Sequence, residues 1–554
     1  MPCLALLVDG ERRATLATPV NDGDLANPVP DAMNSATSPL ESKIGLFEGS
    51  DFRIATGRCT DCAAIPQALW YFANETIAAP RPGRPIAGFT SRITVREDLE
   101  RWAATHPPNG AIDEPPLVWI AAPELLRNAR LSADGRFIDA TGGRWPFALV
   151  PKLPLNRSYY DETSVTFLSS RPLSVRGELN GDSFTARTIW PEDFRLDSNA
   201  ALQRVDTSPQ AIRALVRVEP RGGARSPFAT SLLWERSPGS ARRCENAPVL
   251  AAMLNGAQGD DDEAHGGHFA LVTGRVGPGG AIGDWLANNF YSLDLVSEKG
   301  IIASMLPLDN YLADLNSGQA WYRPSYLLVA VLRSESAAAR IQGALERTYN
   351  HFYRHQLLYQ HATMNCAGVS VDVLRALGWQ VPSRGATSWL AATLSVPYFV
   401  FRNRNVRIAG DAFNYLSEDQ TRLLPAVAFE EIGADLLRIA AGPPTRAQTP
   451  LEAMLAQDLE AIFFLRVPQL PSSRAWGDYP VVSAREYHAR VPSDPAKRQI
   501  IPVPERPFPA HLRDPEVSSP PRQRSEIAVV MWAALSVVGI PWLMWRWWRN
   551  RGAA

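Results

Sequence analysis

The pattern of hydrophobic and polar positions divides the chain into regions of different character. Between residues 86 and 235, apolar and polar side chains alternate in short runs such as SVRGEL, SFTARTIW and AIRALVRVEP. A period of two is typical of half-buried strands, so we predict a mainly β module there. From residue 248 the pattern changes to a hairpin, and helical periodicity then follows over 336–360, 366–378 and 450–465.

These changes predict an α+β protein with a β-rich N-terminal half. The length of 554 residues suffices for three or four domains with substantial cores. We expect a poorly ordered N-terminal segment at 1–45, a Cys-x-x-Cys strand–helix segment at 46–85, a β-rich module at 86–240, an α+β domain with a helical extension at 241–467, a proline-rich linker at 468–525 and a transmembrane helix at 526–548.

The transmembrane prediction depends on a long uncharged segment near the C-terminus. The nineteen residues from Ile527 to Trp545 carry no charge, and tryptophans and arginines cluster at their C-terminal end. At about 1.5 Å of helical rise per residue, this segment matches the roughly 30 Å hydrocarbon core of a bilayer. Aromatic and basic residues are typical of the membrane interface. We therefore expect a single-pass protein with a C-terminal anchor and the lipid bilayer as a partner.

The side of the membrane on which the body lies has two interpretations. Three arginines follow the uncharged segment and two precede it, so the positive-inside rule favours a periplasmic or extracellular body. The first residues, MPCLALLVDGERR, lack the basic start and long apolar stretch of a signal peptide, which favours a tail-anchored protein with a cytoplasmic body. Residues 468–521 predict a semi-extended linker or, alternatively, a loop-rich segment packed on the last domain.

Charge and cysteine content exclude some classes of protein. The formal net charge is -1, so the basic excess of a nucleic-acid-binding protein is missing, and we expect no nucleic-acid partner. The five cysteines are too few and too scattered for a disulfide-stapled mini-protein. Cys59 and Cys62 form a Cys-x-x-Cys motif that suits a redox dithiol, a structural disulfide or two free thiols. A zinc site would need two further ligands, and no second such motif exists.

A candidate nucleophile lies at the start of a predicted helix. Cys366 precedes apolar residues at helical spacing, and Gly378 supplies a C-terminal stop. The unpaired N–H groups and the positive end of the dipole at a helix N-terminus favour a thiolate. The alternative is a buried, inert thiol, because free cysteine is among the most buried residue types.

A candidate base lies at the start of a predicted strand about ninety residues upstream. His268 opens the alternating run GHFALVTGRV, and the turn GPGG then predicts a hairpin. An imidazole that takes the thiol proton is what a cysteine nucleophile needs. If Val276 pairs with Ala281, His268 lies opposite Asn289, which would orient the ring. A bulge would substitute Asn288.

These residues resemble a known family. A histidine that opens a strand, a hairpin partner with a polar residue and a later NCAGV at a helix start are similar to the circularly permuted NlpC/P60 papain-like proteins, in which the histidine precedes the cysteine. The resemblance covers residues 250–380. It implies a permuted papain-like α+β domain with Cys366 as nucleophile, His268 as base and Asn289 as orienting residue. The long, helix-rich insertion between hairpin and cysteine departs from the family pattern.

The resemblance implies a reaction class. Permuted members act as peptidases, amidases or acyltransferases, so a membrane-anchored, thiol-dependent hydrolase or acyltransferase acting on an amide, ester or thioester is expected. Peptidoglycan peptides and lipid-linked acyl groups are the substrate candidates if the body lies in the cell envelope. We expect no cofactor.

Two other functions are open. A metal-dependent hydrolase could use the acidic run Asp260–Glu263 with His265 and His268. It could instead use His351 and His355 at helical spacing, with His361 six residues further on, although no HExxH glutamate is present to act as a base. In the other alternative, the β-rich module binds an envelope partner and the anchor only displays it.

Overall fold

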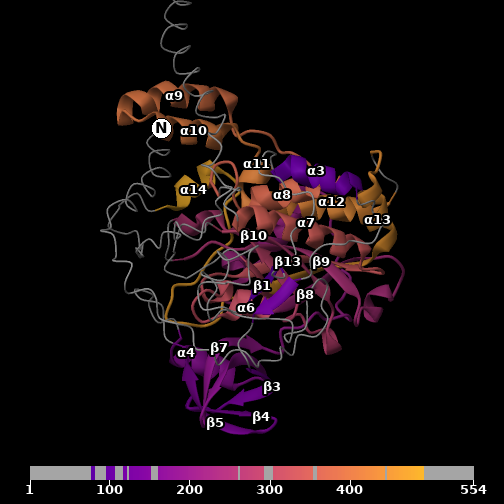
Figure 1. The fold of residues 1–554 in the computed structure, drawn as a ribbon, viewed down its shortest axis with the longest axis vertical. Helices are drawn as coiled ribbons and strands as arrows, with labels where there is room; N and C mark the ends of the chain where they lie inside the picture. The colour runs from indigo at the N-terminus through magenta and orange to yellow at the C-terminus, as the bar shows by residue number, and fades with distance from the viewer. Residues whose placement is uncertain are drawn as a thin grey trace, which may run out of the picture.

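The computed structural model describes residues 77–80, 95–105, 117–120, 124–150, 160–259, 263–291, 304–353, 359–442 and 446–491. A large sheet with packed helices forms the centre of the molecule, a small barrel lies at one end and a helical hairpin at the other (Figure 1). The protein is therefore a mixed α+β structure, as the sequence predicts.

The central sheet combines strands from distant parts of the chain. All of its neighbouring strands are antiparallel. Across the sheet the order is β2 (Leu117–Ile120), β1 (Ile77–Pro80), β12 (Ser304–Pro307), β11 (Leu286–Asn289), β10 (His268–Arg275), β9 (Pro248–Asn255), β13 (Ser325–Leu332), β14 (Leu459–Val467) and β8 (Ala229–Glu235). Both edge strands, β2 and β8, thus precede β9 in the sequence.

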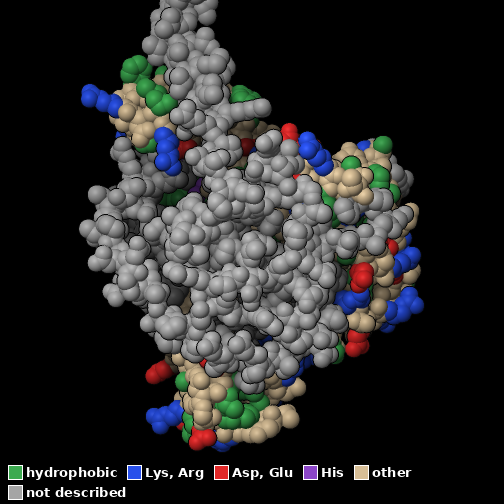
Figure 2. Space-filling view, in the orientation of Figure 1, with side chains coloured by type: hydrophobic (Ala, Val, Ile, Leu, Met, Phe, Trp, Pro, Cys, Tyr) green, Lys and Arg blue, Asp and Glu red, His purple; other side chains and the backbone are tan. Residues whose placement is uncertain are grey.

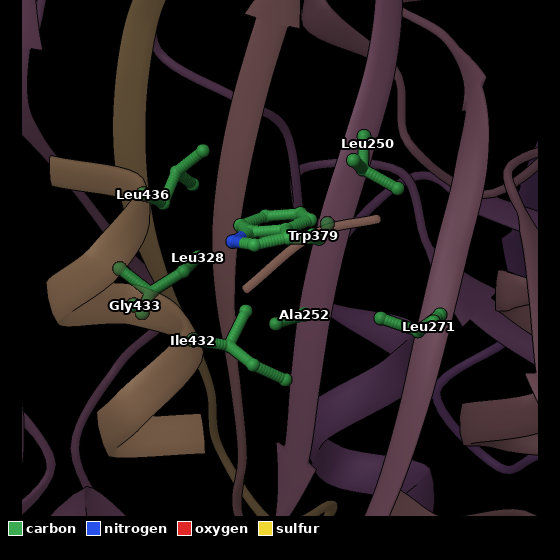
Figure 3. A pocket seen from close by; sticks show the side chains of 9 residues that line it. Leu250, Ala252, Leu271, Leu328, Trp379, Ile432, Gly433 and Leu436 are labelled. Atoms are coloured by element: carbon green, nitrogen blue, oxygen red, sulfur yellow. The ribbon is translucent and has the colours of Figure 1, made fainter. Parts of the chain in front are cut away.

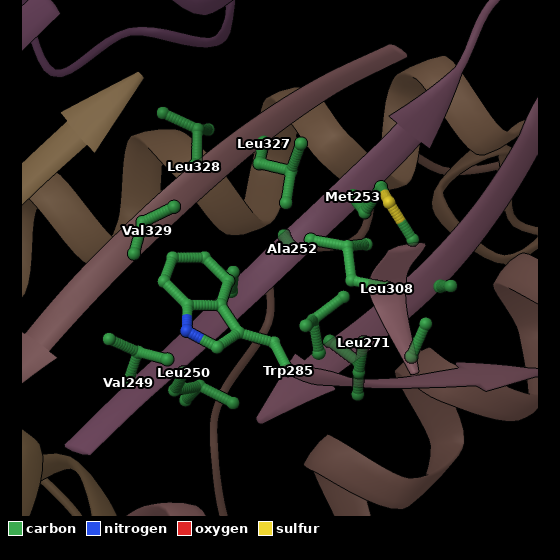
Figure 4. Close-up of a cluster of buried hydrophobic side chains, with 14 of the residues drawn as sticks. Val249, Leu250, Ala252, Met253, Leu271, Trp285, Leu308, Leu327, Leu328 and Val329 are labelled. Atoms are coloured by element: carbon green, nitrogen blue, oxygen red, sulfur yellow. The ribbon is translucent and has the colours of Figure 1, made fainter. Parts of the chain in front are cut away.

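Two neighbouring inner strands are buried along their whole length. Strands β9 and β13 read PVLAAMLN and SYLLVAVL, nearly continuous apolar runs that are typical of strands covered on both faces. Figure 4 shows the Trp285 indole among aliphatic side chains of this region, including Leu250 and Leu308. The indole N–H of Trp285 donates to the carbonyl of Arg275 at 2.7 Å, so the polar group of this buried ring is satisfied.

Helices cover the middle of the sheet. Helix α8 (Cys366–Ala376) packs on β10, while α7 (Ser336–Tyr353) and α12 (Pro425–Ala441) pack on β9 and β10. Helix α3 (Val95–Thr105) lies against α7 and α8. Helix α6 (Leu308–Ala313) packs against β11 and β12 and also against barrel strand β7. Helix α8 therefore has its N-terminus over the hairpin that begins at His268.

A recess between α12 and the sheet is a packing gap. Its lining consists of apolar or small residues, and no charged side chain reaches it: Leu250, Ala251, Ala252, Leu271, Leu328, Trp379, Ile432, Gly433 and Leu436 (Figure 3). Gly433 brings α12 close to the sheet, because a Cβ atom there would lie 2.2 Å from Cδ1 of Leu328. Without converging polar groups the recess lacks the character of a ligand site.

The barrel lies between β2 and β8 in the sequence. Its closed order is β3 (Glu124–Leu131), β4 (Phe137–Ala140), β5 (Gly143–Leu149), β7 (Ser183–Pro191) and β6 (Leu173–Asn180), and β5 and β7 pair in parallel. Helix α4 (Glu162–Ser169) packs on β3. Arg176 of β6 connects the barrel to the remainder of the molecule, since its guanidinium bonds to Asp309 at 2.8 Å and to Asp284 at 3.1 Å.

Several predicted elements are confirmed, and two are wrong. The segments SVRGEL and SFTARTIW lie in β6 and β7 as expected. The segment AIRALVRVEP instead forms most of α5 (Pro209–Arg217), where Ser208 caps the N-terminus. The predicted helix at 450–465 ends early: α13 spans Pro450–Asp458, and the chain continues as β14. The sequence LEAIFFLRV is rich in the β-branched and aromatic residues that strands favour.

The expected boundary at residue 240 differs from the structure. The barrel ends at Pro191, and α5 and β8 already belong to the sheet and its helices, with β8 paired to β14. Residues 468–491 pack on the body rather than extending from it: Leu470 and Val481 are buried, and this segment ends in α14 (Ala484–Arg490). The first part of the proline-rich region is therefore a loop-rich segment packed on the body, which is the second of the two interpretations given above.

The N-terminal segment, the Cys59–Cys62 motif and the segment at 526–548 lie outside the described residues. Among the residues that are described, no helix combines the length and the hydropathy needed to cross a membrane.

Candidate active site

Cys366 is the first residue of α8. Asn365 is the N-cap, and its side-chain oxygen accepts a hydrogen bond from the N–H of Gly368 at 2.9 Å. The Asn365 amide group also donates to the carbonyl of Leu423 at 2.8 Å, which fixes the loop in front of the helix. The predicted helix and its start are thus confirmed, and the thiol lies at the positive end of the helix dipole.

His268 is the first residue of β10, and Asn289 is the last residue of β11. Their side chains meet, with 2.6 Å between Nε2 of His268 and Oδ1 of Asn289. The sequence predicts this partner through a register in which the two residues are directly opposite, but the observed register pairs Leu271 with Asn288. The register is therefore shifted by two residues, which leaves every side chain on its predicted face.

The sulfur of Cys366 lies beside the start of β10. The backbone N–H of Phe269, the residue after His268, and the Tyr359 hydroxyl lie close enough to the thiol to lower its pKa. Helix α8 packs directly on β10. The fold thus places Cys366 next to the residue that follows His268, and His268 is bonded to Asn289. We refer to Cys366, His268 and Asn289 together as the candidate cluster.

The three side chains of this cluster are nearly inaccessible to solvent. Cys366 is 3 % exposed, His268 4 % and Asn289 1 %. Burial raises the pKa of the Cys366 thiol, although the nearby N–H and O–H donors oppose that shift. Burial also lowers the pKa of His268 to about 3, with a further contribution from the positive charge of Arg323. At neutral pH both groups are therefore uncharged in the free protein.

The Asn289 contact selects one tautomer of His268. An amide oxygen can only accept a hydrogen bond, so Nε2 of the neutral ring carries the hydrogen. Nδ1 then carries the lone pair and is the nitrogen that can accept a proton. The backbone carbonyl of Asn289 accepts a hydrogen bond from the Tyr349 hydroxyl of α7 at 2.5 Å, which holds the end of β11 in place.

Aromatic side chains surround the cluster. The ring centroids of His268 and Tyr291 are 6.2 Å apart, and those of Tyr291 and Tyr359 are 6.0 Å apart. The Tyr359 ring meets the exposed His361 edge-on at 5.3 Å. No local pattern marks these residues in the sequence, because the loop before Cys366 brings them together only in the folded chain.

A buried arginine also belongs to this region. Arg323 is 5 % exposed, and its Nε donates to Oε1 of Gln319 at 3.0 Å. Its charge lowers the pKa of Cys366 and His268, so it favours a thiolate and disfavours an imidazolium. A buried cation is a group that can recognise a polar part of a ligand.

The other candidates from the sequence lie elsewhere or outside the described residues. Asn288 points to the opposite face of the sheet, where its amide donates to Gln342 of α7 at 3.0 Å. Of the candidate metal ligands, Asp260–Asp262 and His355 lie outside the described residues, and the side chain of His351 is not described. Within the described part of the chain, no group of three or more His, Cys, Asp or Glu side chains is arranged to hold a metal ion.

Comparisons with known proteins identify no relative. No family model, curated protein or solved structure matches the chain.

The buried, neutral His268 predicts a pH-dependent stability. Its folded-state pKa of about 3 lies below the 6.5 of an unfolded chain, so between these values only the unfolded state binds the proton. The stabilisation is complete above pH 6.5 and is lost as the pH falls. We expect a loss on the order of 2 kcal/mol from His268 between pH 6.5 and 5. Urea unfolding at both pH values measures this loss in the wild type and in His268→Gln. The prediction is wrong if the free energy of unfolding changes equally with pH in the two proteins.

Proposed function

We propose that the protein is a membrane-anchored, cysteine-dependent hydrolase or acyltransferase that acts on an amide, ester or thioester carbonyl. The observation that carries the proposal is the 2.6 Å contact between Nε2 of His268 and Oδ1 of Asn289, next to Phe269, whose N–H lowers the pKa of the Cys366 thiol. A thiol, an imidazole and an orienting amide are the groups that nucleophilic catalysis requires.

The first half of the reaction forms a thioester on the protein. The Cys366 sulfur attacks the carbonyl carbon while the thiol proton passes to Nδ1 of His268. The bond between the carbonyl carbon and the leaving group then breaks, and the leaving group takes this proton. The developing oxyanion can be stabilised by the backbone N–H of Cys366 at the helix start and by the Tyr359 hydroxyl.

The second half returns the free thiol. Water, or the amine or hydroxyl of an acceptor, attacks the thioester carbon and gives its proton to Nδ1 of His268. The bond between carbon and sulfur breaks, and the sulfur recovers the proton. Water as the attacking group gives hydrolysis, whereas an acceptor gives acyl transfer.

The substrate class and the location follow from the sequence. The resemblance of GHFALV and NCAGV to the permuted NlpC/P60 papain-like proteins supports carbonyl chemistry, and the uncharged segment 527–545 supports a membrane anchor. Peptidoglycan peptides and lipid-linked acyl groups are therefore the substrates that we propose, with the body on the periplasmic or extracellular side.

Capture of the acyl-enzyme tests this function. The full chain, reconstituted in detergent, is mixed with p-nitrophenyl esters of short and long acyl chains, quenched in acid and analysed by peptide mass spectrometry. We expect an acyl adduct on Cys366 and none on Cys244, the other free and buried cysteine among the described residues.

Two results would contradict the proposal. Turnover without an adduct, suppressed by a chelator and restored by zinc, would favour the metal-dependent hydrolase. Absence of both adduct and turnover over the whole ester series, with an intact thermal unfolding transition, would favour a non-catalytic binding protein.

A further inference from the structure

The hairpin of α9 (Trp389–Asn403) and α10 (Val406–Ser417) exposes an apolar surface. Four large side chains of α9 are exposed: Trp389 at 64 %, Leu390 at 72 %, Leu394 at 46 % and Phe401 at 70 %. Leu390, Leu394 and Phe401 are spaced by four and seven residues, so they lie on one face of the helix. We call these three residues the outer stripe.

The outer stripe is not needed to hold the hairpin together. The opposite side of α9 packs on α10 through its own cluster of buried residues: Val396, Phe399, Ile408, Ala409 and Ala412. Isolated exposed apolar residues are common on protein surfaces, but a stripe of large ones along a helix marks an interaction surface.

Positive charge accompanies the outer stripe. Arg402, Arg404 and Arg407 are exposed at the tip where α9 turns into α10, whereas Asp411 is the one acidic residue from Trp389 to Ser417. Figure 2 shows green side chains and blue side chains close together in this part of the molecule. Apolar side chains flanked by arginines match the boundary between acyl chains and anionic headgroups of a bilayer.

The base of the hairpin is bonded to the loop that carries Cys366. Arg422 of α11 (Gln420–Leu423), four residues beyond the C-cap of α10, donates to the carbonyl of Thr363 at 3.0 Å and to Asp372 of α8 at 2.8 Å. Asn365 donates to the carbonyl of Leu423 at 2.8 Å. In Figure 1, α8 and α11 lie on the side of the body that faces the hairpin. Contact of the hairpin with a surface would therefore orient the Cys366 loop towards that surface.

We propose that the outer stripe inserts into the interface of an anionic bilayer and that this contact presents the Cys366 site to acyl groups in lipid. The second part rests on the proposed function and narrows its substrate class to lipid-linked acyl chains. The first part is independent of catalysis.

Depth-dependent quenching tests the bilayer contact in the full chain. An environment-sensitive fluorescent amino acid replaces Leu390 in one preparation and Val218, which is 67 % exposed after α5, in the control. Both proteins are reconstituted into vesicles of phosphatidylcholine or of phosphatidylcholine and phosphatidylglycerol at about 3:1, with and without brominated acyl chains.

We expect bromolipid quenching at position 390, stronger with phosphatidylglycerol, and none at position 218. Replacing Arg402, Arg404 and Arg407 with glutamine should remove the dependence on anionic lipid. Equal emission and no quenching at both positions would overturn the proposal. Blue-shifted emission at 390 without bromolipid quenching would also overturn it, because a protein segment would then cover the outer stripe.

Rates on two esters separate this inference from the proposed function. The triple variant Leu390→Ser, Leu394→Ser and Phe401→Ser should lower the ratio of p-nitrophenyl palmitate to p-nitrophenyl acetate hydrolysis in vesicles about tenfold or more, whereas Val218→Ser should not. An unchanged ratio would refute presentation of lipid substrates. If the wild type hydrolyses neither ester, the function fails, and the quenching result, which Cys366→Ala should leave intact, still decides the bilayer contact.

Discussion

Replacing Cys366 with alanine is expected to lower turnover of an activated ester by at least about a thousandfold. The methyl group cannot form the thioester, and the remaining donors only stabilise an oxyanion. The side chain is 3 % exposed and small, so the variant should fold. Ester hydrolysis in the full chain, with iodoacetamide labelling of the same position, measures the loss.

His268 provides a second measurement of the same site. His268→Ala should lower kcat by about a hundredfold to ten-thousandfold, the usual range for a general base. Because the two residues act as a unit, Cys366→Ala combined with His268→Ala should be no slower than Cys366→Ala alone.

The matched control is Cys244→Ala, which removes another buried free cysteine just before β9, where β9 pairs with the end of β10 opposite His268. Its activity should equal that of the wild type. Wild-type rates in Cys366→Ala, or additive losses in the double variant, would contradict the assignment of a catalytic pair.

Removing the carboxylate of Asp309 is expected to destabilise the protein by about 3–5 kcal/mol. Arg176 and Asp309 are each 2 % exposed at the junction of barrel and sheet, and the guanidinium Nε donates to Asp309 at 2.8 Å. Asp309→Ala leaves this buried guanidinium with Asp284 alone, which is partly exposed. Most of the cost therefore comes from a buried charge that lacks its main counter-ion.

Urea unfolding followed by circular dichroism measures this effect. The exposed pair of Arg96 and Glu100 is the control, and Glu100→Ala should change the free energy of unfolding by less than about 1 kcal/mol. Replacing Arg176 and Asp309 together by Met and Leu should cost less than Asp309→Ala, since no charge then remains buried. A loss below 1 kcal/mol in Asp309→Ala would contradict the interpretation.

The parts of the site that the sequence predicts depend on short-range patterns. The helix at Cys366 follows from apolar spacing and the glycine after it, and the strand at His268 follows from alternation. Asn289 was predicted from a register that is wrong by two residues. The predicted contact between His268 and Asn289 nevertheless forms, because a register shift of two residues keeps each side chain on the same face of the sheet.

The parts that the sequence does not predict depend on long-range contacts. Residues 459–465 continue a helical pattern, but pairing with β8 and β13 on both sides makes them a strand. Residues 211–217 alternate, yet burial of one side against α12 and the Ser208 cap make them a helix. Tyr359 and Arg323 reach the Cys366 thiol from separate segments, so no local signal identifies them.

The strand order of the central sheet has a consequence for how the chain is made. Edge strand β8 has β14 as its neighbour, and register joins Glu235 to Ala461. A ribosome that has released residues up to 440 has already exposed β8 and β13, but the strand that belongs between them has not yet emerged. Two apolar strands then have open hydrogen-bonding edges, which favours aggregation. The nascent chain therefore needs protection until its last strand emerges, and sheet closure comes late in synthesis.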